Sequence, residues 1–189
     1  MEKAQARREI ERRIRLLTPQ QRAVNNARIA SALAALPEFS GAGTVMLYMS
    51  IGDEVDTLPV VERALAQGKN VALPKVDLKA KTMAAWRITD IGRGIAAGTF
   101  GIPEPALPDV VDPADIDFCL VPARGFDTLG NRLGRGGGYY DRFMAAPGFR
   151  AVRCGVAFDF QLLENLPQEP HDLPVNIIVT ESRILRVGC

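Results

Sequence analysis

Residues 44–73 have the sequence TVMLYMSIGDEVDTLPVVERALAQGKNVAL, and the expected fold class follows from the pattern in this stretch. It begins with Thr44–Met49, a short apolar run rich in residues that favour strands. Apolar residues then recur at helical spacing over Leu58–Gln67, and Gly68 ends the predicted helix. A second strand-like run, Asn70–Leu73, follows at once. The pattern therefore predicts a β-α-β unit.

Further strand-like runs follow this unit along the chain. We predict strands over Thr82–Ile88, Ile116–Val121, Ala151–Phe158, Asn176–Thr180 and Arg183–Val187. The proline-rich segment Gly98–Pro113 is expected to be an irregular connection across the surface. Strands that alternate with helices in units of roughly 30 residues predict a mostly parallel sheet covered on both faces.

Two helices are predicted before the first strand. Apolar residues recur every three or four positions in residues 4–17, with Arg and Glu between them, which is typical of an amphipathic helix. Thr18 is a good N-cap, Pro19 suits the first helical position and Gln21 completes a capping box. The second helix should therefore run to about Ala35, where Pro37 and a glycine end it.

Size, composition and charge are those of an ordinary globular domain. At 189 residues and 20.5 kDa, the chain suits a single domain over residues 1–189 with a sizeable core. Its 47% hydrophobic and 24% charged residues argue against a disordered or collagen-like chain. No apolar run approaches the roughly 18 residues of a membrane span. The net charge of +1 gives no general attraction for nucleic acid or anionic lipid.

Three cysteines, Cys119, Cys154 and Cys189, are odd in number and widely spaced. This arrangement fits neither a disulfide framework nor a paired zinc site. The N-terminal residues are charged throughout and lack the apolar stretch of a signal peptide. We therefore expect a cytoplasmic protein in a reducing compartment. We also expect a monomer, with neither a nucleic-acid nor a membrane partner.

The densest chemical signal is the glycine-rich segment at residues 130–142, GNRLGRGGGYYDR. Glycines allow consecutive backbone N–H groups to converge on an anion, and a helix expected to begin near Tyr139 adds its dipole. Arg132 and Arg135 supply guanidinium groups that match phosphate oxygens. The segment therefore predicts a phosphate-binding loop, although a flexible loop with two solvated arginines is the alternative.

Neither common phosphate motif fits this loop, because it lacks the last glycine of GxGxxG and does not end in the GK[ST] of a P-loop. Asp141 directly follows the two tyrosines, where a carboxylate can meet a magnesium ion beside bound phosphates. The alternative for Asp141 is an acid at a helix N-terminus, favoured by the helix dipole.

A second group of polar residues, Tyr48–Thr57, follows the first predicted strand. Ligands of open α/β sheets bind at the carboxyl edge, where this segment should lie. Glu54 could accept hydrogen bonds from a ring nitrogen or amino group of a substrate, whereas a solvated loop acid is the simpler interpretation. The single histidine, His171, lies in a proline-rich segment and is more typical of a structural residue than of a zinc ligand.

Taken together, these motifs resemble those of the 5-formyltetrahydrofolate cyclo-ligase family, whose members are also called methenyltetrahydrofolate synthetases. Besides the glycine-rich segment, the resemblance rests on Val121-Pro122 through Phe126-Asp127, the Lys3 and Arg7 start, Tyr48 to Glu54, Gly101–Pro105, and the His171-Asp172 turn followed by Ile177–Glu181. It covers nearly the whole chain. The fold it implies is α/β, a three-layer α/β/α domain with a mostly parallel sheet, similar to the sugar-phosphate isomerase and CoA-transferase superfamily.

The resemblance implies an enzyme, an ATP- and Mg²⁺-dependent ligase. It would close 5-formyltetrahydrofolate, with or without a polyglutamate tail, to 5,10-methenyltetrahydrofolate, giving ADP and phosphate. The residues it implies for ATP are Lys3, Arg7, Arg132, Leu133, Gly134, Arg135, Gly136, Gly137, Gly138, Tyr139 and Tyr140. Of these, Arg132, Arg135 and Tyr140 are the expected catalytic residues. Asp141 and Asp172 would ligate magnesium, and Met49 and Glu54 would contact the folate.

Two alternatives stay open at this point. One is a paralogue that binds nucleotide or folate without this activity. The other is a sugar-phosphate isomerase of the same fold, which would need no ATP.

Overall fold

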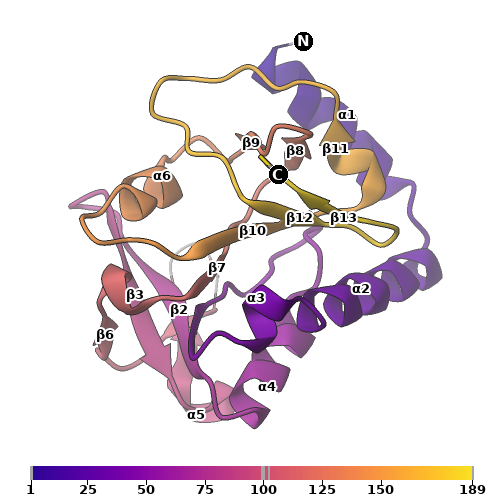
Figure 1. Ribbon diagram of the computed structural model, residues 1–189. Coiled ribbons are helices and arrows are strands. Elements are labelled where there is room, and N and C mark those ends of the chain that lie inside the picture. The colour runs from indigo at the N-terminus through magenta and orange to yellow at the C-terminus, as the bar shows by residue number, and fades with distance from the viewer. Residues whose placement is uncertain (1, 99–100, 102, 189) are drawn as a thin grey trace.

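The computed structural model describes residues 2–98, 101 and 103–188, and within them a long mixed sheet runs through the molecule (Figure 1). Five neighbouring strands are parallel: β12 (Ile177–Val179), β10 (Val152–Val156), β7 (Phe118–Leu120), β1 (Thr44–Met46) and β2 (Asn70–Asp77). Antiparallel strands complete both edges: β13 (Ile184–Arg186) beside β12, and β3 (Thr82–Ile88) with β6 (Val110–Val111) beside β2. The predicted mostly parallel sheet is therefore confirmed.

Helices cover one face of this sheet. They are α2 (Pro19–Ala34), α3 (Pro37–Ser40) and α4 (Leu58–Ala66), which lie together below β10 and β12 in Figure 1. Alternate residues of the strands, such as Val71 and Leu73 of β2, point into a core shared with these helices. Phe39 packs edge-on against Phe118, with 5.4 Å between the ring centroids. Burial of this face holds the three helices in place.

The other face carries a thinner layer. Its helix is α6 (Tyr139–Met144), and beside it lies a small sheet of β11 (Leu162–Leu163), β8 (Gly125–Asp127) and β9 (Arg132–Leu133). Met46, Cys119 and Ile178 face this side and share a second core with Phe126 and Phe143. The three layers are thus present, but a small sheet supplies much of the second outer layer.

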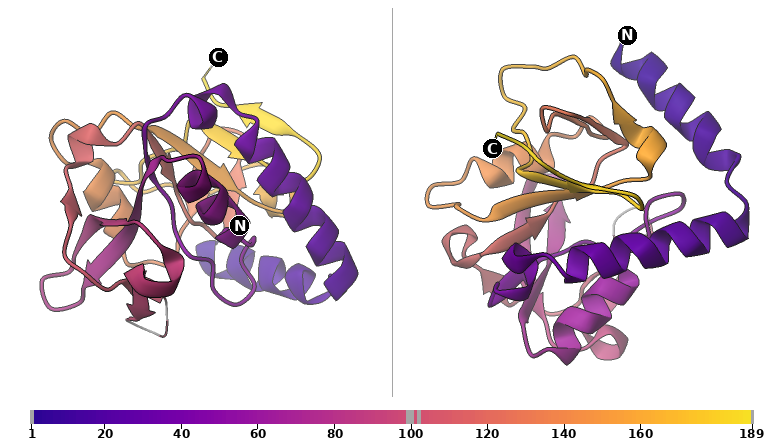
Figure 2. Two further views of the ribbon diagram at one scale, coloured as in Figure 1. Left: turned by 90° about the horizontal axis from the view of Figure 1, so that it is seen from below. Right: turned by 45° about the vertical axis from the view of Figure 1, so that its right-hand side comes forward.

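Helix α1 (Lys3–Arg15) stands apart from α2 and α3 and packs over the small sheet (Figure 2). Its buried residues Ala6, Ile10 and Ile14 contact Leu133 and Leu166. The chain turns between α1 and α2 at the predicted capping box, in which Thr18 Oγ1 accepts from Gln21 N and Gln21 Oε1 accepts from Thr18 N. Both helix predictions are therefore confirmed.

Several boundaries differ from the sequence predictions. Strand β1 ends at Met46 rather than Met49. Strand β2 runs on to Asp77, because it pairs with β3 from Val71 to Asp77. A short helix, α3, begins at Pro37, where the chain was expected only to break. Proline at the first helical position lacks an N–H that would have no partner there, so it starts this helix readily.

The prediction that Gly98–Pro113 is irregular is wrong in part. After the short helix α5 (Ile91–Gly94), β4 (Ile95–Ala97) pairs with β5 (Pro103–Pro105), and β6 joins the edge of the main sheet. Prolines are tolerated here because these are edge strands. Thr99, Phe100 and Ile102 of this segment lie outside the described residues. Short 3₁₀ turns, η2 (Pro113–Asp115) and η3 (Asp159–Gln161), complete the described elements.

Two of the three cysteines, Cys119 and Cys154, are buried free thiols. Burial raises the pKa of Cys119 to about 12, so this thiol stays protonated and unreactive at neutral pH. Cys189 lies outside the described residues. Among the helices that the structure describes, none is both long enough and apolar enough to cross a membrane.

Candidate active site

A cavity of about 620 Å³ opens at the carboxyl ends of β1, β2 and β7. Residues that follow β1 (Tyr48 and Met49) and β7 (Pro122 and Ala123) line it, as does Val76 of β2. Volumes of this size are typical of small-molecule sites, and the edge is the one where open α/β sheets bind ligands.

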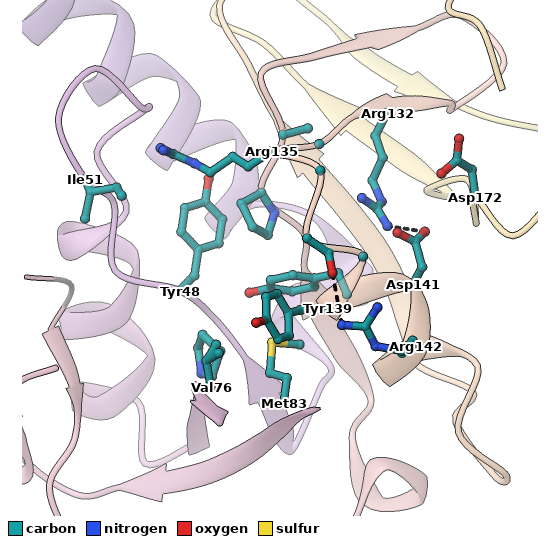
Figure 3. Close-up of a pocket in the computed structure, with 18 of the residues that line it drawn as sticks. Tyr48, Ile51, Val76, Met83, Arg132, Arg135, Tyr139, Asp141, Arg142 and Asp172 are labelled. Atoms are coloured by element: carbon teal, nitrogen blue, oxygen red, sulfur yellow. Dashed lines mark hydrogen bonds and ion pairs between the residues drawn. The ribbon is translucent and has the colours of Figure 1, made fainter. Parts of the chain in front are cut away.

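The cavity has two chemically distinct walls (Figure 3). The charged wall comprises Lys3, Arg7, Arg132, the glycine loop Gly134–Gly138, Tyr139, Tyr140, Asp141, Arg142, Glu169, His171 and Asp172. The apolar wall comprises Tyr48, Met49, Ile51, Pro74, Val76, Leu78, Met83 and Pro103. Arg132, Asp141 and Asp172 lie together on one side of the view, and Tyr48 and Ile51 lie on the other.

The glycine loop adopts a backbone that side chains would obstruct. Gly136 and Gly138 have φ values of +94° and +63°, in the left-handed region that glycine tolerates. A Cβ at Gly137 would lie 2.8 Å from the Tyr139 ring. Because α6 has only six residues, its dipole contributes little, and attraction for an anion comes mainly from the arginines and exposed backbone groups.

Arg132 and Asp141 form an ion pair that is buried on both sides. Asp141 Oδ1 also accepts a hydrogen bond from Leu173 N at 3.1 Å, which ties α6 to the segment that carries Asp172. The contact from Arg132 Nη2 lacks hydrogen-bond geometry, and Nε and Nη2 have no hydrogen-bond partner among the described residues. Buried guanidinium donors without partners are costly, so Arg132 is poised to donate to an anion in the cavity.

Helix α1 closes the charged wall with two cations. Lys3 Nζ lies 2.9 Å from Glu169 Oε1 and 3.0 Å from Asp172 Oδ2, and Arg7 donates to Gly134 O through Nε and Nη2. The hydrogen bond to Glu169 is the largest cause that raises the pKa of Lys3. Burial acts to raise the pKa of Asp172, but the backbone N–H of Glu169 and the Lys3 ammonium outweigh it, so this pKa is lowered. Both groups are therefore charged at neutral pH.

One ion pair connects the two walls. Arg135 extends from the glycine loop toward the side of the cavity that holds Tyr48, and its Nη2 lies 2.7 Å from Glu54 Oε1. The other oxygen of Glu54 accepts from Ile51 N at 3.0 Å, which fixes the carboxylate on the loop after β1. A residue expected to contact phosphate and one expected to contact folate are thus in direct contact.

Two tyrosines line the same cavity: Tyr48 is buried, and Tyr140 is half-buried with a buried hydroxyl. Burial is the main cause that raises the pKa of both Tyr48 and Tyr140 well above the usual 10. The Tyr140 hydroxyl has no hydrogen-bond partner among the residues that the structure describes. It is therefore a protonated donor available to a ligand at neutral pH.

Every site residue expected from the sequence lines the cavity except Leu133. The Leu133 side chain instead packs under α1 with Ile10 and Ile14, so only its backbone belongs to the loop. Met49 and Glu54 lie at the cavity as expected. Arg142 and Glu104 also line the cavity, and neither was predicted as a site residue. Arg142 follows Asp141 in the glycine-rich segment, so its proximity in sequence was the available signal.

A magnesium ion suits this wall only together with a ligand. Among the described residues, no group of three or more His, Cys, Asp or Glu side chains forms a ready metal site. Magnesium commonly takes one or two protein carboxylates and completes its shell with phosphate and water. Asp141 and Asp172 meet that requirement in chemistry, although each is paired with a cation here.

Comparisons with known proteins identify a family that this chain resembles. A model of the "5-formyltetrahydrofolate cyclo-ligase family" matches residues 1–181. The 5-formyltetrahydrofolate cyclo-ligase of Escherichia coli strain K12 is 32% identical over 178 residues, which are 93% of this chain and 98% of that protein. The protein of the same name from Mus musculus is 27% identical and covers 93% of this chain and 92% of its own length.

Solved structures give the same result. The NMR structure of Aquifex aeolicus 5,10-methenyltetrahydrofolate synthetase superposes with a TM-score of 0.86 at 35% identity, covering 100% of this chain and 94% of that one. The synthetase of that name from Mycoplasma pneumoniae superposes with a TM-score of 0.77 at 23% identity, covering 96% and 99% of the two chains, and supports the fold alone. Because the family model spans almost the whole sequence and the E. coli relative matches over nearly its full length, this chain belongs to the 5-formyltetrahydrofolate cyclo-ligase family.

Proposed function

We propose that this protein uses ATP to close 5-formyltetrahydrofolate to 5,10-methenyltetrahydrofolate, with release of ADP and phosphate. The observation that carries the proposal is the pairing of a charged and an apolar wall in one cavity of a chain from this family. The charged wall suits the triphosphate, and the apolar wall suits the flat pterin ring. The ion pair between Arg135 and Glu54 marks where the two substrates would meet.

The reaction needs positioning and charge neutralisation more than covalent help from the protein. The formyl oxygen attacks the γ-phosphorus, the bond to the bridging oxygen breaks, and ADP leaves. N10 then attacks the activated one-carbon centre, N10 loses its proton, and the former formyl oxygen departs with phosphate. In this scheme Arg132 and Arg135 neutralise charge on the transferred group, Tyr140 donates a hydrogen bond to it, and Glu54 orients the folate.

Other residues hold the nucleotide. Arg7 holds α1 against the loop, and Lys3 holds it against the segment around Asp172. The glycines Gly134–Gly138 and the ring of Tyr139 would surround the phosphates, and Leu133 would position the loop from outside the cavity lining. Asp141 and Asp172 would hold the magnesium ion, which supplies positive charge to the phosphate oxygens when bound. Met49 would contact the folate from the apolar wall.

The test is to mix protein, 5-formyltetrahydrofolate and Mg-ATP, to follow the methenyl chromophore and to measure ADP. We expect product and ADP in equal amounts, and no product when either ATP or divalent metal is omitted. Turnover that proceeds equally without ATP would contradict the ligase assignment. Nucleotide or folate binding without product would favour a paralogue that only binds its ligands.

We further propose that the protein works as a cytoplasmic monomer and accepts polyglutamylated substrate. Sedimentation at assay concentration and a comparison of mono- and polyglutamate substrates test these points.

A further inference from the structure

Glu104 is a buried acid beside the apolar wall. It lies in β5, its side chain is 5% exposed, and it is one of the residues that line the cavity. Its neighbours on this side are apolar, including Pro74, Val76 and Pro103. Burying a carboxylate is costly unless its charge is balanced and its oxygens accept hydrogen bonds, so this residue needs a specific explanation.

The charge of Glu104 is balanced by a lysine that lies outside the cavity lining. Lys75 Nζ lies 2.8 Å from Glu104 Oε2 and 5.7 Å from the centre of the Trp86 ring, and Lys75 is not one of the residues that line the cavity. No hydrogen bond to Glu104 Oε1 is formed by the described residues. The side chain also packs tightly on Gly98, where a Cβ would lie 2.3 Å from Oε2, so its position is restricted. One oxygen of a fixed carboxylate is thus free to accept.

Four other acids line the cavity, and they differ from Glu104 in one respect. Asp141, Asp172, Glu169 and Glu54 each pair with a cation that lines the cavity as well, namely Arg132, Lys3 or Arg135. A ligand on that side meets both charges of each pair. At Glu104 only the acid of the pair lines the cavity, because Lys75 is not among the lining residues. This position therefore favours a ligand group that donates hydrogen bonds next to a flat apolar surface.

We propose that Glu104 is a specificity residue that accepts hydrogen bonds from the donor edge of the pterin ring, its 2-amino group and N3–H. This inference rests on the proposed function. It names the part of the substrate that this side of the cavity recognises. Adjacent ring donors match a carboxylate well, and a charge-assisted hydrogen bond is stronger than a neutral one. A ring without these donors would leave the buried carboxylate unsatisfied, which gives discrimination.

The test uses three variants and the ordinary assay. Glu104→Leu removes the acceptor and should raise KM for 5-formyltetrahydrofolate tenfold or more while KM for ATP changes less than twofold. Glu104→Gln keeps one carbonyl oxygen and should show a smaller rise. Lys75→Met removes the ion pair but keeps the carboxylate, so it should raise this KM less than Glu104→Leu does.

Folding is controlled separately, because Glu104→Leu leaves the Lys75 ammonium without its partner. The double variant Lys75→Met and Glu104→Leu removes both charges, and its melting temperature should return toward the parent value. Its KM for the folate should nevertheless stay as high as that of Glu104→Leu. A purely structural ion pair predicts the reverse, with KM recovering together with stability.

A substrate analogue provides the decisive comparison. A 5-formyltetrahydrofolate that carries a methyl group in place of the 2-amino group should be a poor substrate for the parent enzyme, with KM raised tenfold or more. Glu104→Leu should show nearly the same KM for both substrates. If the variant discriminates between the two substrates as strongly as the parent does, Glu104 does not recognise the donor edge of the ring. Absence of ATP-dependent turnover by the parent protein would instead overturn the proposed function itself.

Discussion

The two walls of the cavity are built in different ways. Half of the apolar wall comes from the hairpin of β2 and β3, neighbouring strands paired in register over seven residues, and most of the rest follows β1. The charged wall brings together α1, the glycine loop, α6 and the segment around Asp172, which lie far apart in the sequence. These segments are joined by side-chain contacts such as Lys3 to Asp172 and Arg132 to Asp141.

Because of this difference, substitutions on the two walls should have different effects on stability and on ligand binding. Substitutions on the apolar wall leave a hydrogen-bonded hairpin in place and should change only how the folate fits. Substitutions on the charged wall remove both a ligand contact and a link between segments, so they should change stability and nucleotide use together. Variants of the charged wall and of the ion pair that joins the two walls test this contrast.

The largest effect is expected for Asp141→Asn. The substitution removes the negative partner of buried Arg132, and breaking a buried ion pair costs roughly 3–5 kcal/mol. At about 2–4 °C per kcal/mol for a chain of this length, the melting temperature should fall by roughly 10 °C. Turnover with Mg-ATP, measured well below that temperature, should fall roughly 100-fold or more.

Asp115→Asn is the matched control, because Asp115 is an exposed acid in η2 and does not line the cavity. It should leave melting temperature and activity at parent values. If Asp141→Asn lowered stability but kept full activity and the ordinary metal requirement, Asp141 would be a structural link and not a metal ligand.

The second prediction concerns the ion pair that joins the walls. Arg135→Ala should raise KM for ATP, Glu54→Gln should raise KM for the folate, and each should lower kcat/KM roughly tenfold, or about 1.4 kcal/mol. Because the two side chains are in contact, the double variant should lose less than the product of the single losses, by about 1 kcal/mol. Exact multiplication of the two effects would show that the walls act independently.

The third prediction is a smaller effect with a defined pH range. Lys3→Met should raise KM for ATP roughly fivefold, about 1 kcal/mol, and lower stability by about 0.5 kcal/mol, since the ion pairs of Lys3 are partly exposed. The pKa of Asp172 is lowered from 3.8, so its contribution is present above that pH and is lost as the pH falls through the folded-state pKa. The pKa of Lys3 is raised from 10.5, so its contribution is lost as the pH rises above that value.

Melting curves of the parent protein and Lys3→Met between pH 3 and 11 test this window. The difference in stability should be constant from about pH 5 to 9 and should shrink at both ends. Arg8→Met, an exposed cation on the same helix with no described partner, should show no such difference. If the difference in stability between the parent and Lys3→Met persists below the folded-state pKa of Asp172, Lys3 stabilises α1 in another way.

The same contrast explains what the sequence could predict. The capping box at Thr18 and the strand-helix-strand pattern of residues 44–73 are local signals, and the structure confirms them with shifted ends. The glycines and two arginines predicted an anion-binding loop, because backbone freedom and side-chain charge also follow directly from the local sequence. The β4–β5 pair and the small sheet have strands of two or three residues, too short for a periodic pattern.

Contacts between distant segments could not be predicted in this way. The sequence around Arg132 does not indicate that it forms an ion pair with Asp141. The sequence around Glu104 does not indicate that it pairs with Lys75. Asp127 belongs to the quoted motif, but its role emerges only from packing. It is fully buried and accepts from the backbone N–H of Asn131 and of Leu166, which joins the start of the glycine-rich segment to the chain that leads to Asp172.

The smallest effect is expected for Tyr140→Phe, and it separates a ligand contact from a structural link within the charged wall. The Tyr140 hydroxyl is buried and has no described hydrogen-bond partner, so its removal should change the melting temperature by no more than about 1 °C, or should raise it slightly. If this hydroxyl donates to the transferred phosphoryl group, kcat should fall roughly threefold, about 0.7 kcal/mol, with KM for both substrates unchanged. Because burial raises the pKa of Tyr140 well above 10, the phenol stays protonated and the parent enzyme should show no loss of kcat from its titration up to pH 10. Lower stability with unchanged kcat would place Tyr140 among the links of the charged wall, whereas unchanged stability with lower kcat would show that its hydroxyl serves the ligand alone.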